Sequence, residues 1–154
     1  ERVLRSLALL QTLQDYPPDH ACDDSARQAA RDVLRYFDVA GPLHHEDEEL
    51  HVFPVVLLQG SADAVDRVHQ LQDDHLHMGM HWRDARRRLL ALAEGQTHSF
   101  SAEDEATFAL FSQGYAAHIA SEEEVVYPAA RALLSESALQ QMGQEMRQRR
   151  GAAE

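Results

Sequence analysis

The chain of 154 residues lacks several features that would place it in common classes. It contains a single cysteine, Cys22, so an internal disulfide is impossible, and this favours a reducing, cytoplasmic location. No apolar run approaches the roughly 20 residues that span a bilayer, so we expect no membrane segment. Long period-2 alternation and the Asn-Gly or Asp-Gly turns of hairpins are also missing, which argues against a β-sheet.

Basic residues are scarce as well. Lys and Arg number 14 against 26 Asp and Glu, which gives a formal charge of −12. A chain with so little cationic surface is not expected to bind nucleic acid or an anionic membrane, and the sequence identifies no protein partner. The chain instead contains ten His. An acidic, His-rich composition favours a metal cation as a partner.

Apolar residues recur at spacings of three and four, which is typical of amphipathic helices. The pattern predicts long helices over residues 1–14, 26–59, 62–94 and 102–134, and a short last helix over 138–150. We expect Asp24 or Ser25 to cap the second helix, Gly41-Pro42 to kink it or break it in two, Pro54 to bend it again, and Gly95 to end the third. Short connections between the helices predict an all-α, up-down-up-down four-helix bundle that forms one domain over residues 1–154.

Two eleven-residue stretches share one pattern. HHEDEELHVFP begins at His44 and HIASEEEVVYP begins at His118. Each places Glu four residues after its first His and ends with an aromatic residue followed by Pro. Six pairs match at one constant offset: Phe37/Phe111, His44/His118, Glu48/Glu122, Val52/Val126, Phe53/Tyr127 and Pro54/Pro128. We interpret the repeat as a pseudo-symmetric pair of helices that face a shared site.

The His and Glu of each stretch lie on the apolar faces of their helices. Residues four apart share one face, so His44 lies beside Glu48 and His118 beside Glu122. His75 falls on the apolar stripe of the third helix. Because a buried carboxylate without a partner is strongly destabilising, these carboxylates need a strong compensating partner, and a divalent or trivalent metal supplies one.

Two other interpretations of these residues were weighed. The two His–Glu pairs could be buried ion pairs with protonated His, although such pairs rarely stabilise a core better than apolar residues do. His75 could be a core His with satisfied hydrogen bonds. The metal interpretation accounts for all five residues, because imidazole and carboxylate together suit iron, manganese or zinc, and two Glu can bridge two ions.

Six further residues near these five stay open as ligands: His45, Glu49, His51, His77, His81 and Glu123. We expect His45, Glu49 and Glu123 to hydrogen-bond to the ligands or to face solvent. His51 would need a second E-x-x-H motif, and the sequence contains none. The other two flank the apolar stripe of the third helix and would ligate only if that helix rotated.

The two stretches also resemble the signature segments of hemerythrin-like proteins, the HHE cation-binding domain. The resemblance runs from the first helix to about residue 150. It implies a four-helix bundle with a non-haem di-iron centre that is ligated by His and bridging carboxylates. Carried over position by position, it implies these metal ligands: His44, Glu48, His75, His118 and Glu122.

The chain departs from that family's pattern in two places. Family members carry a ligand His in the first helix, whereas no His precedes His20 here. The oxygen carriers of the family also place two His four apart on the third helix. In this chain Gly79 occupies that position after His75.

We therefore expect a protein with two non-haem iron ions, with manganese or zinc as alternative metals. It would bind or sense O₂ or a related small oxidant, nitric oxide or peroxide, rather than turn over a substrate. Two alternatives stay open. The same centre could serve an oxidoreductase, such as a peroxidase, a ferroxidase or an NO-handling enzyme, or the helices could form a metal-free module for protein contacts.

Overall fold

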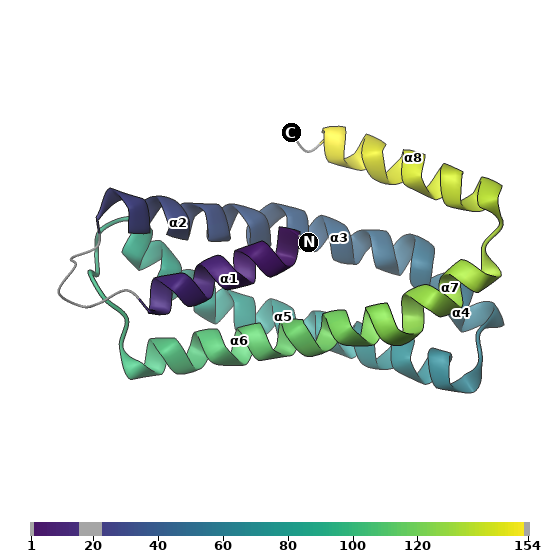
Figure 1. Cartoon of the computed structure of the whole chain (residues 1–154), viewed down its shortest axis with the longest axis horizontal. Helices are drawn as coiled ribbons and strands as arrows, with labels where there is room; N and C mark the ends of the chain where they lie inside the picture. Colours follow the sequence, from purple (N-terminus) through teal and green to yellow (C-terminus); the bar gives the residue numbers. More distant parts are fainter. Residues whose placement is uncertain (1, 16–22, 153–154) are drawn as a thin grey trace. The chain divides into compact units, whose positions relative to one another are not determined.

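The computed structural model describes residues 2–15 and 23–152, with side chains described as far as residue 149. Within these ranges the chain is helical and contains no strand. Its longer helices are α1 (Arg2–Gln14), α2 (Asp24–Arg35), α5 (Ala62–Ala93), α6 (Ala102–Ser121) and α8 (Glu136–Ala152) (Figure 1). No helix in the described part of the chain is long and apolar enough to cross a membrane.

Two of the predicted helices contain π-helical turns. The second consists of α2, η1 (Tyr36–Ala40), α3 (Gly41–Asp47), η2 (Glu48–Val52) and α4 (Phe53–Gln59) in succession. The fourth consists of α6, η3 (Glu122–Val126) and α7 (Tyr127–Leu133). The predicted helices are therefore present, and three single π turns, η1, η2 and η3, widen them.

The prolines explain where the π turns end. Pro54 and Pro128 occupy the first turns of α4 and α7. A proline has no N–H, and its ring would clash with the carbonyl oxygen four residues earlier in a regular helix. The turn before each proline is widened, so Phe53 N–H donates to Glu48 O and Tyr127 N–H donates to Glu122 O, five residues back. The bend predicted at Pro54 therefore takes the form of a π turn that begins at Glu48.

The ends of the helices agree in part with the sequence. Gly95 follows α5 with a φ of 73°, a conformation that favours glycine, so the predicted stop is confirmed. The predicted cap of α2 was wrong by one position. Asp23, rather than Asp24 or Ser25, accepts the backbone N–H of Ala26 at 2.8 Å. Asp23 lies just outside the helix, where its carboxylate can reach the free N–H groups of the first turn.

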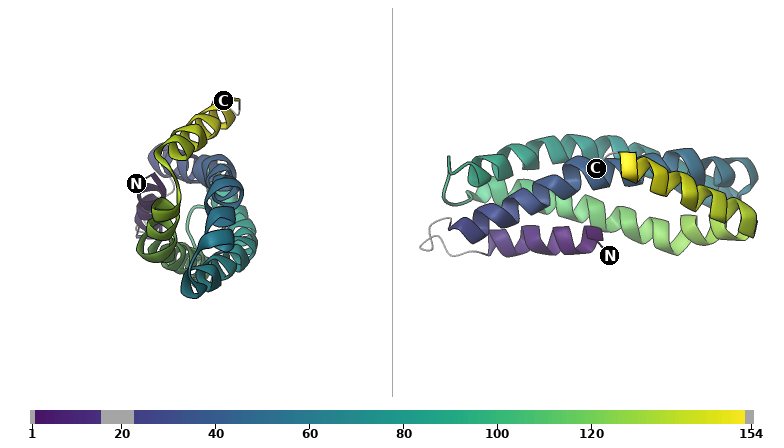
Figure 2. Two further views of the ribbon diagram at one scale, coloured as in Figure 1. Left: turned by 90° about the vertical axis from the view of Figure 1, so that its right-hand side faces the viewer. Right: turned by 90° about the horizontal axis from the view of Figure 1, so that it is seen from above.

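The chain divides into two compact units, each built from two separate segments. The first unit comprises Glu1–Pro42 and Leu76–Tyr115, and the second comprises Leu43–His75 and Ala116–Glu154. In the first unit α1 lies beside α2 (Figures 1 and 2). The organisation as one domain stays a prediction.

Aromatic side chains form the interior of the first unit. The rings of Phe37 and Phe111, which the repeat matches, meet edge to face with centroids 4.9 Å apart. Trp82 and Tyr115 lie within 5.3 Å of both. Such tilted and edge-on contacts are the favoured arrangements of aromatic pairs.

The second unit has an aliphatic core in which α4 lies beside α7 (Figure 1). Its buried members are Val52, Phe53, Val56, Ala64, Val68, Leu71, Val126 and Ala130. Both members of the matched Val52/Val126 pair are among them. The repeat therefore contributes equivalent apolar positions to one core, next to its polar residues.

Within the second unit, an ion pair joins helix α8 to the end of α3. Arg149 Nη2 lies 2.5 Å from Asp47 Oδ1, and Asp47 is only 2% exposed. The same nitrogen lies 2.7 Å from His51 Nε2, and His51 lies 3.6 Å from Glu145. His51 is thus engaged with α8.

We predict that Arg149→Ala destabilises the second unit, because it breaks the ion pair that Arg149 makes with the buried Asp47. Breaking a fully buried pair costs about 3–5 kcal/mol, and the partial exposure of Arg149 reduces our expectation to about 2–3 kcal/mol. Chemical denaturation measures the change. Arg147→Ala, on an exposed position of the same helix, is the control and should change stability by less than about 0.5 kcal/mol. Equal stabilities of the two variants would contradict the prediction.

Candidate metal centre

The second unit contains all five predicted ligands, and it brings them together. His44 Nε2 lies 3.1 Å from Glu48 Oε1, and His118 Nε2 lies 2.6 Å from Glu122 Oε1. His75 Nε2 lies 3.4 Å from Glu48 Oε2 and 3.2 Å from His118 Nε2. Glu48, His118 and Glu122 are at most 2% exposed. Side chains from α3, η2, α5, α6 and η3 therefore converge in one buried cluster.

The cluster consists of two groups that share one carboxylate. The nitrogen-rich group is His45, Glu48, His75 and His118, and the oxygen-rich group is His44, Glu48 and Glu122. In each group every residue offers one ligand atom, and these atoms lie within 4.8 Å of one another. Glu48 Oε1 faces His44 and Oε2 faces His75. The arrangement thus offers two adjacent cation positions that have Glu48 in common.

Two carboxylates outside the cluster lie beside its imidazoles. Glu49 Oε1 lies 2.9 Å from His75 Nδ1, and Gln72 donates a hydrogen bond to the other oxygen of Glu49 at 2.9 Å. Asp74 Oδ2 lies 3.5 Å from His118 Nδ1, but that nitrogen has no hydrogen-bond partner. For His75, the carboxylate on Nδ1 holds the proton there and directs the Nε2 lone pair into the cluster, an arrangement common among metal-binding His.

Tyr127 contacts the cluster in a way that the sequence alone did not reveal. Its hydroxyl group donates a hydrogen bond to Glu48 Oε1, and it lies 3.1 Å from Glu122 Oε2 and 3.3 Å from His44 Nε2. Burial raises the pKa of Tyr127, and the neighbouring charges of Glu48 and Glu122 raise it further. The phenol therefore stays protonated as a donor in the metal-free chain. The available signal was the exchange of Phe53 for Tyr127 between the two halves of the repeat.

The two buried carboxyl groups have opposite pKa shifts. Burial and the charge of Glu48 raise the pKa of Glu122 to about 9. For Glu48, burial acts in the same upward direction, but the interactions with His44 and His75 outweigh it and hold its pKa below the ordinary value. In the metal-free chain at neutral pH, the pair therefore carries one proton and one negative charge.

The imidazoles of His45 and His118 are neutral. Burial lowers the pKa of His45 to about 3, with a further contribution from His75. Burial also lowers the pKa of His118. The ion-pair interpretation requires a protonated His118 and is therefore disfavoured. Neutral imidazoles have a free lone pair for a metal.

The unsatisfied atoms of the cluster test whether a metal fits. Glu48 Oε2 and Glu122 Oε1 are buried and have no hydrogen-bond partner. Buried polar atoms are normally paired. Here each carboxylate oxygen faces imidazole nitrogen atoms whose lone pairs also point inward. A cation is the partner that satisfies carboxylates and neutral imidazoles together, so the residues present fit a metal.

The structure separates the six residues that the sequence left open. His45 joins the nitrogen-rich group, although its spacing suggested a position beside the ligands. Glu49 hydrogen-bonds to His75. His77 and Glu123 are exposed, His81 is partly exposed, and His51 is engaged with Arg149. None of these four belongs to either group.

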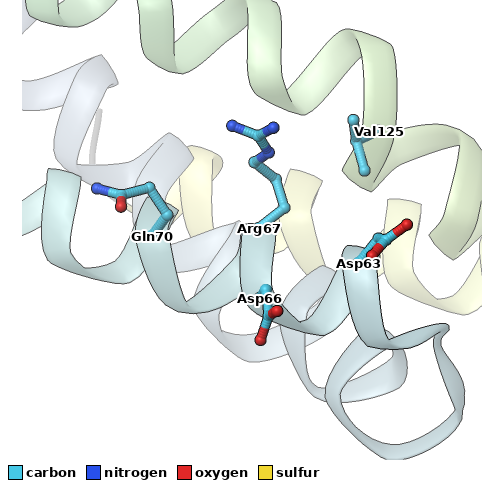
Figure 3. Close-up of a pocket in the computed structure, with 5 residues that line it drawn as sticks. All are labelled: Asp63, Asp66, Arg67, Gln70 and Val125. Carbon is cyan, nitrogen blue, oxygen red and sulfur yellow. The ribbon is translucent and has the colours of Figure 1, made fainter.

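A surface hollow of about 510 Å³ lies elsewhere on the second unit. It is lined by Asp63, Asp66, Arg67, Gln70 and Val125 (Figure 3). The guanidinium group of Arg67 reaches to 3.5 Å from Ser121, and the side chain of Asp66 points away from it (Figure 3). The residues of this hollow do not converge on a common point, in contrast to the buried cluster.

Comparison with known proteins agrees with this geometry. The hemerythrin HHE cation binding domain matches residues 1–130. The chain belongs to the hemerythrin HHE cation-binding family. An uncharacterized protein of Haemophilus influenzae is 31% identical to this hemerythrin-like chain over 153 residues, which is 99% of this chain and 86% of the relative.

Membership of the hemerythrin family confirms the resemblance seen in the sequence and the all-α bundle fold. It also establishes the class of ligand, because the family is a cation-binding domain and this member contains a matching His/Glu cluster. The role of each of the five residues as a ligand stays a prediction. Helix α1 contains no His, so within the described residues the first helix offers no imidazole ligand.

We predict that the metal-free chain loses stability as the pH rises. The folded-state pKa of Glu122 is about 9, against an ordinary value of 4.5, so its contribution is complete below pH 4.5 and is lost as the pH approaches 9. Glu122→Gln has a neutral side chain throughout. Denaturation of chelator-treated protein at a series of pH values should therefore show wild type losing stability relative to this variant. Glu124→Gln, at an exposed position, should follow wild type, and parallel curves for all three proteins would contradict the prediction.

Proposed function

We propose that this hemerythrin-like chain holds two non-haem iron ions and uses them to bind or sense O₂ or a related small oxidant, nitric oxide or peroxide. The observation that supports the proposal is the position of Glu48, which is shared by two adjacent groups of candidate ligands. A single metal site would use only one of these groups. A carboxylate between two positions is typical of dinuclear carboxylate centres in helical bundles.

The residues of the two groups determine which metals suit the centre. His75 and His118 would hold one ion with Glu48, and His44 and Glu122 would hold the other with Glu48. Imidazole and carboxylate ligands accept iron, manganese and zinc. Bound iron would supply a reversible change of oxidation state next to a position that a small molecule can reach.

The charge of the metal-free centre supports cation binding. Glu48 is ionised, Glu122 retains its proton, and His45 and His118 are neutral. A nearby cation favours ionised carboxylate, so metal uptake would release the Glu122 proton. The centre would then offer two carboxylates to two ions.

Apolar side chains line part of the centre, whereas the side chain of His44 is 41% exposed. The ring of Phe53 stacks on His75 with centroids 5.6 Å apart, and Val52 and Val126, four residues after the two glutamates, are buried. Apolar walls of this kind limit the access of water and influence the redox potential of a bound metal. They favour a small, uncharged ligand over a large polar substrate.

We predict that Glu48→Ala removes both metals, because it removes the residue that the two groups share. Elemental analysis of protein purified without chelators or a metal-affinity tag should give two metals per chain for wild type and fewer than one for the variant. The melting temperature should fall with metal content, because metal bound to the native state stabilises it. Glu46→Ala, at an exposed position on α3, is the matched control. Retention of two metals by Glu48→Ala would show that this ligand assignment is wrong.

Anaerobic loading with iron followed by exposure to O₂ tests the function. A visible absorbance change that reverses when O₂ is removed would support binding or sensing. Multiple turnover with hydrogen peroxide would instead favour the oxidoreductase alternative. A chain that takes up no iron, manganese or zinc would refute the proposal in favour of a metal-free helical module.

We also predict that Tyr127→Phe weakens metal binding without unfolding the chain. The variant keeps the ring but removes the hydroxyl group that contacts Glu48 and Glu122. Loss of a group that orients ligands typically costs about 10- to 100-fold in metal affinity. Competition with a chelator measures this change. An affinity equal to that of wild type would show that the hydroxyl group does not organise the carboxylates.

A further inference from the structure

The two halves of the sequence repeat differ at positions inside the centre. His45 corresponds to Ile119, and Phe53 corresponds to Tyr127, at the offset that matches His44 with His118. A symmetric centre would need equivalent residues at these positions. The repeat therefore supplies one half of the centre with an additional imidazole, from His45, that the other half lacks.

The helix places His45 beside Glu48. His44 and His45 precede Glu48 by four and three residues, and both spacings put side chains on neighbouring parts of one helix face. His44 faces Glu48 Oε1. His45 turns towards the opposite side, where its ring stacks on that of His75 with centroids 4.1 Å apart and an interplanar angle of 18°. Its ring centroid also lies 5.6 Å from that of His118.

His45 lies close to Glu48, one of whose oxygens has no hydrogen-bond partner. Glu48 Oε2 lies 3.4 Å from His75 Nε2, is buried, and has no hydrogen-bond partner. One ligand atom from each of His45, Glu48, His75 and His118 lies within 4.8 Å of the others. Three imidazole nitrogens and one carboxylate oxygen are therefore clustered closely enough for a single ion to contact all four.

We propose that His45 is a ligand of the nitrogen-rich position and that it makes the two metal positions chemically unequal. The inference rests on the proposed dinuclear centre and adds to it a fourth imidazole. The nitrogen-rich position has three imidazoles and a share of Glu48. The oxygen-rich position has His44, Glu122 and a share of Glu48.

Unequal ligand sets give unequal preferences for metals. Imidazole-rich sites suit Fe²⁺, Zn²⁺ and Co²⁺, whereas carboxylate-rich sites suit harder ions such as Mn²⁺. Cations of borderline softness should therefore fill the nitrogen-rich position first. A mixed-metal centre becomes possible, with the softer ion held by His45, His75 and His118.

The test uses the full chain, freed of metal and titrated with ¹¹³Cd²⁺ alone. Cadmium NMR signals shift downfield as nitrogen replaces oxygen among the ligands, so wild type should give two separate signals at two equivalents. His45→Phe keeps a ring to stack on His75 but has no ligand nitrogen. It should move the downfield signal upfield, leave the other close to its wild-type position, and weaken the tighter binding step by at least about 100-fold in chelator competition, beyond the 10- to 100-fold typical of groups that only orient a ligand.

The controls separate the possible failures. His69→Phe, at an exposed position on α5, should leave both signals and both affinities unchanged. If wild type binds two cadmium ions and His45→Phe changes neither signal nor affinity, His45 is not a ligand, although the dinuclear centre stands. If wild type binds no metal, the proposed function itself fails.

A second measurement avoids dependence on the folding of the variant. Two-bond ¹H–¹⁵N spectra of wild type labelled in its His residues should show four imidazoles whose ring nitrogens shift on cadmium binding: His44, His45, His75 and His118. Three shifted imidazoles, with His45 unchanged, would overturn the proposal.

Discussion

The second unit is organised around a carboxylate that water cannot reach. Glu48 is 1% exposed, yet its neighbours hold it in the charged form. Desolvation of a charge is costly, so a side chain in this position must be matched by groups that remain in place whether or not a metal is present. His44 and Tyr127 contact one oxygen of Glu48, and His75 approaches the other. The positions of the remaining cluster residues follow from the need to surround this carboxylate on both sides.

Both helices that supply a buried Glu contain a π turn, which ends next to a proline. In both halves of the repeat Pro stands six residues after the buried Glu, and the π turn between them begins at that Glu. A π turn inserts one residue into the helical repeat and so alters which side chains face inward beyond it. Beyond η2, Phe53 and Val56 are fully buried, and Val52 and Val126 enter the core four residues after Glu48 and Glu122. The aromatic-Pro ending of each stretch is therefore part of the design of the site, although it lies outside the group of ligands.

Sequence reasoning found the residues that follow helical periodicity and missed those that depend on contacts between helices. His44, Glu48, His118 and Glu122 could be identified because a spacing of four on an apolar face is visible in one dimension. The roles of Tyr127 and of the Asp47–Arg149 pair could not, since each depends on which distant helix lies opposite. The stacking of His45 on His75 could not be foreseen for a related reason, because His75 lies 30 residues further along the chain. Whether His45 is a ligand stays open.

The two halves of the repeat are most informative at the positions where their residues differ. Matched positions such as Phe37/Phe111 and Val52/Val126 are apolar and maintain packing, so their equivalence needs only similar shape. The mismatched positions lie at the centre and differ in polarity: His45 against Ile119, and Tyr127 against Phe53. Glu49 and Glu123 are the same residue, but Glu49 hydrogen-bonds to His75 whereas Glu123 is exposed. A hydroxyl group is added on the side of Glu122, and an imidazole on the side of His75. Two cations in such a centre would meet different ligand fields, and a small molecule that approached them would find one position more electron-rich than the other.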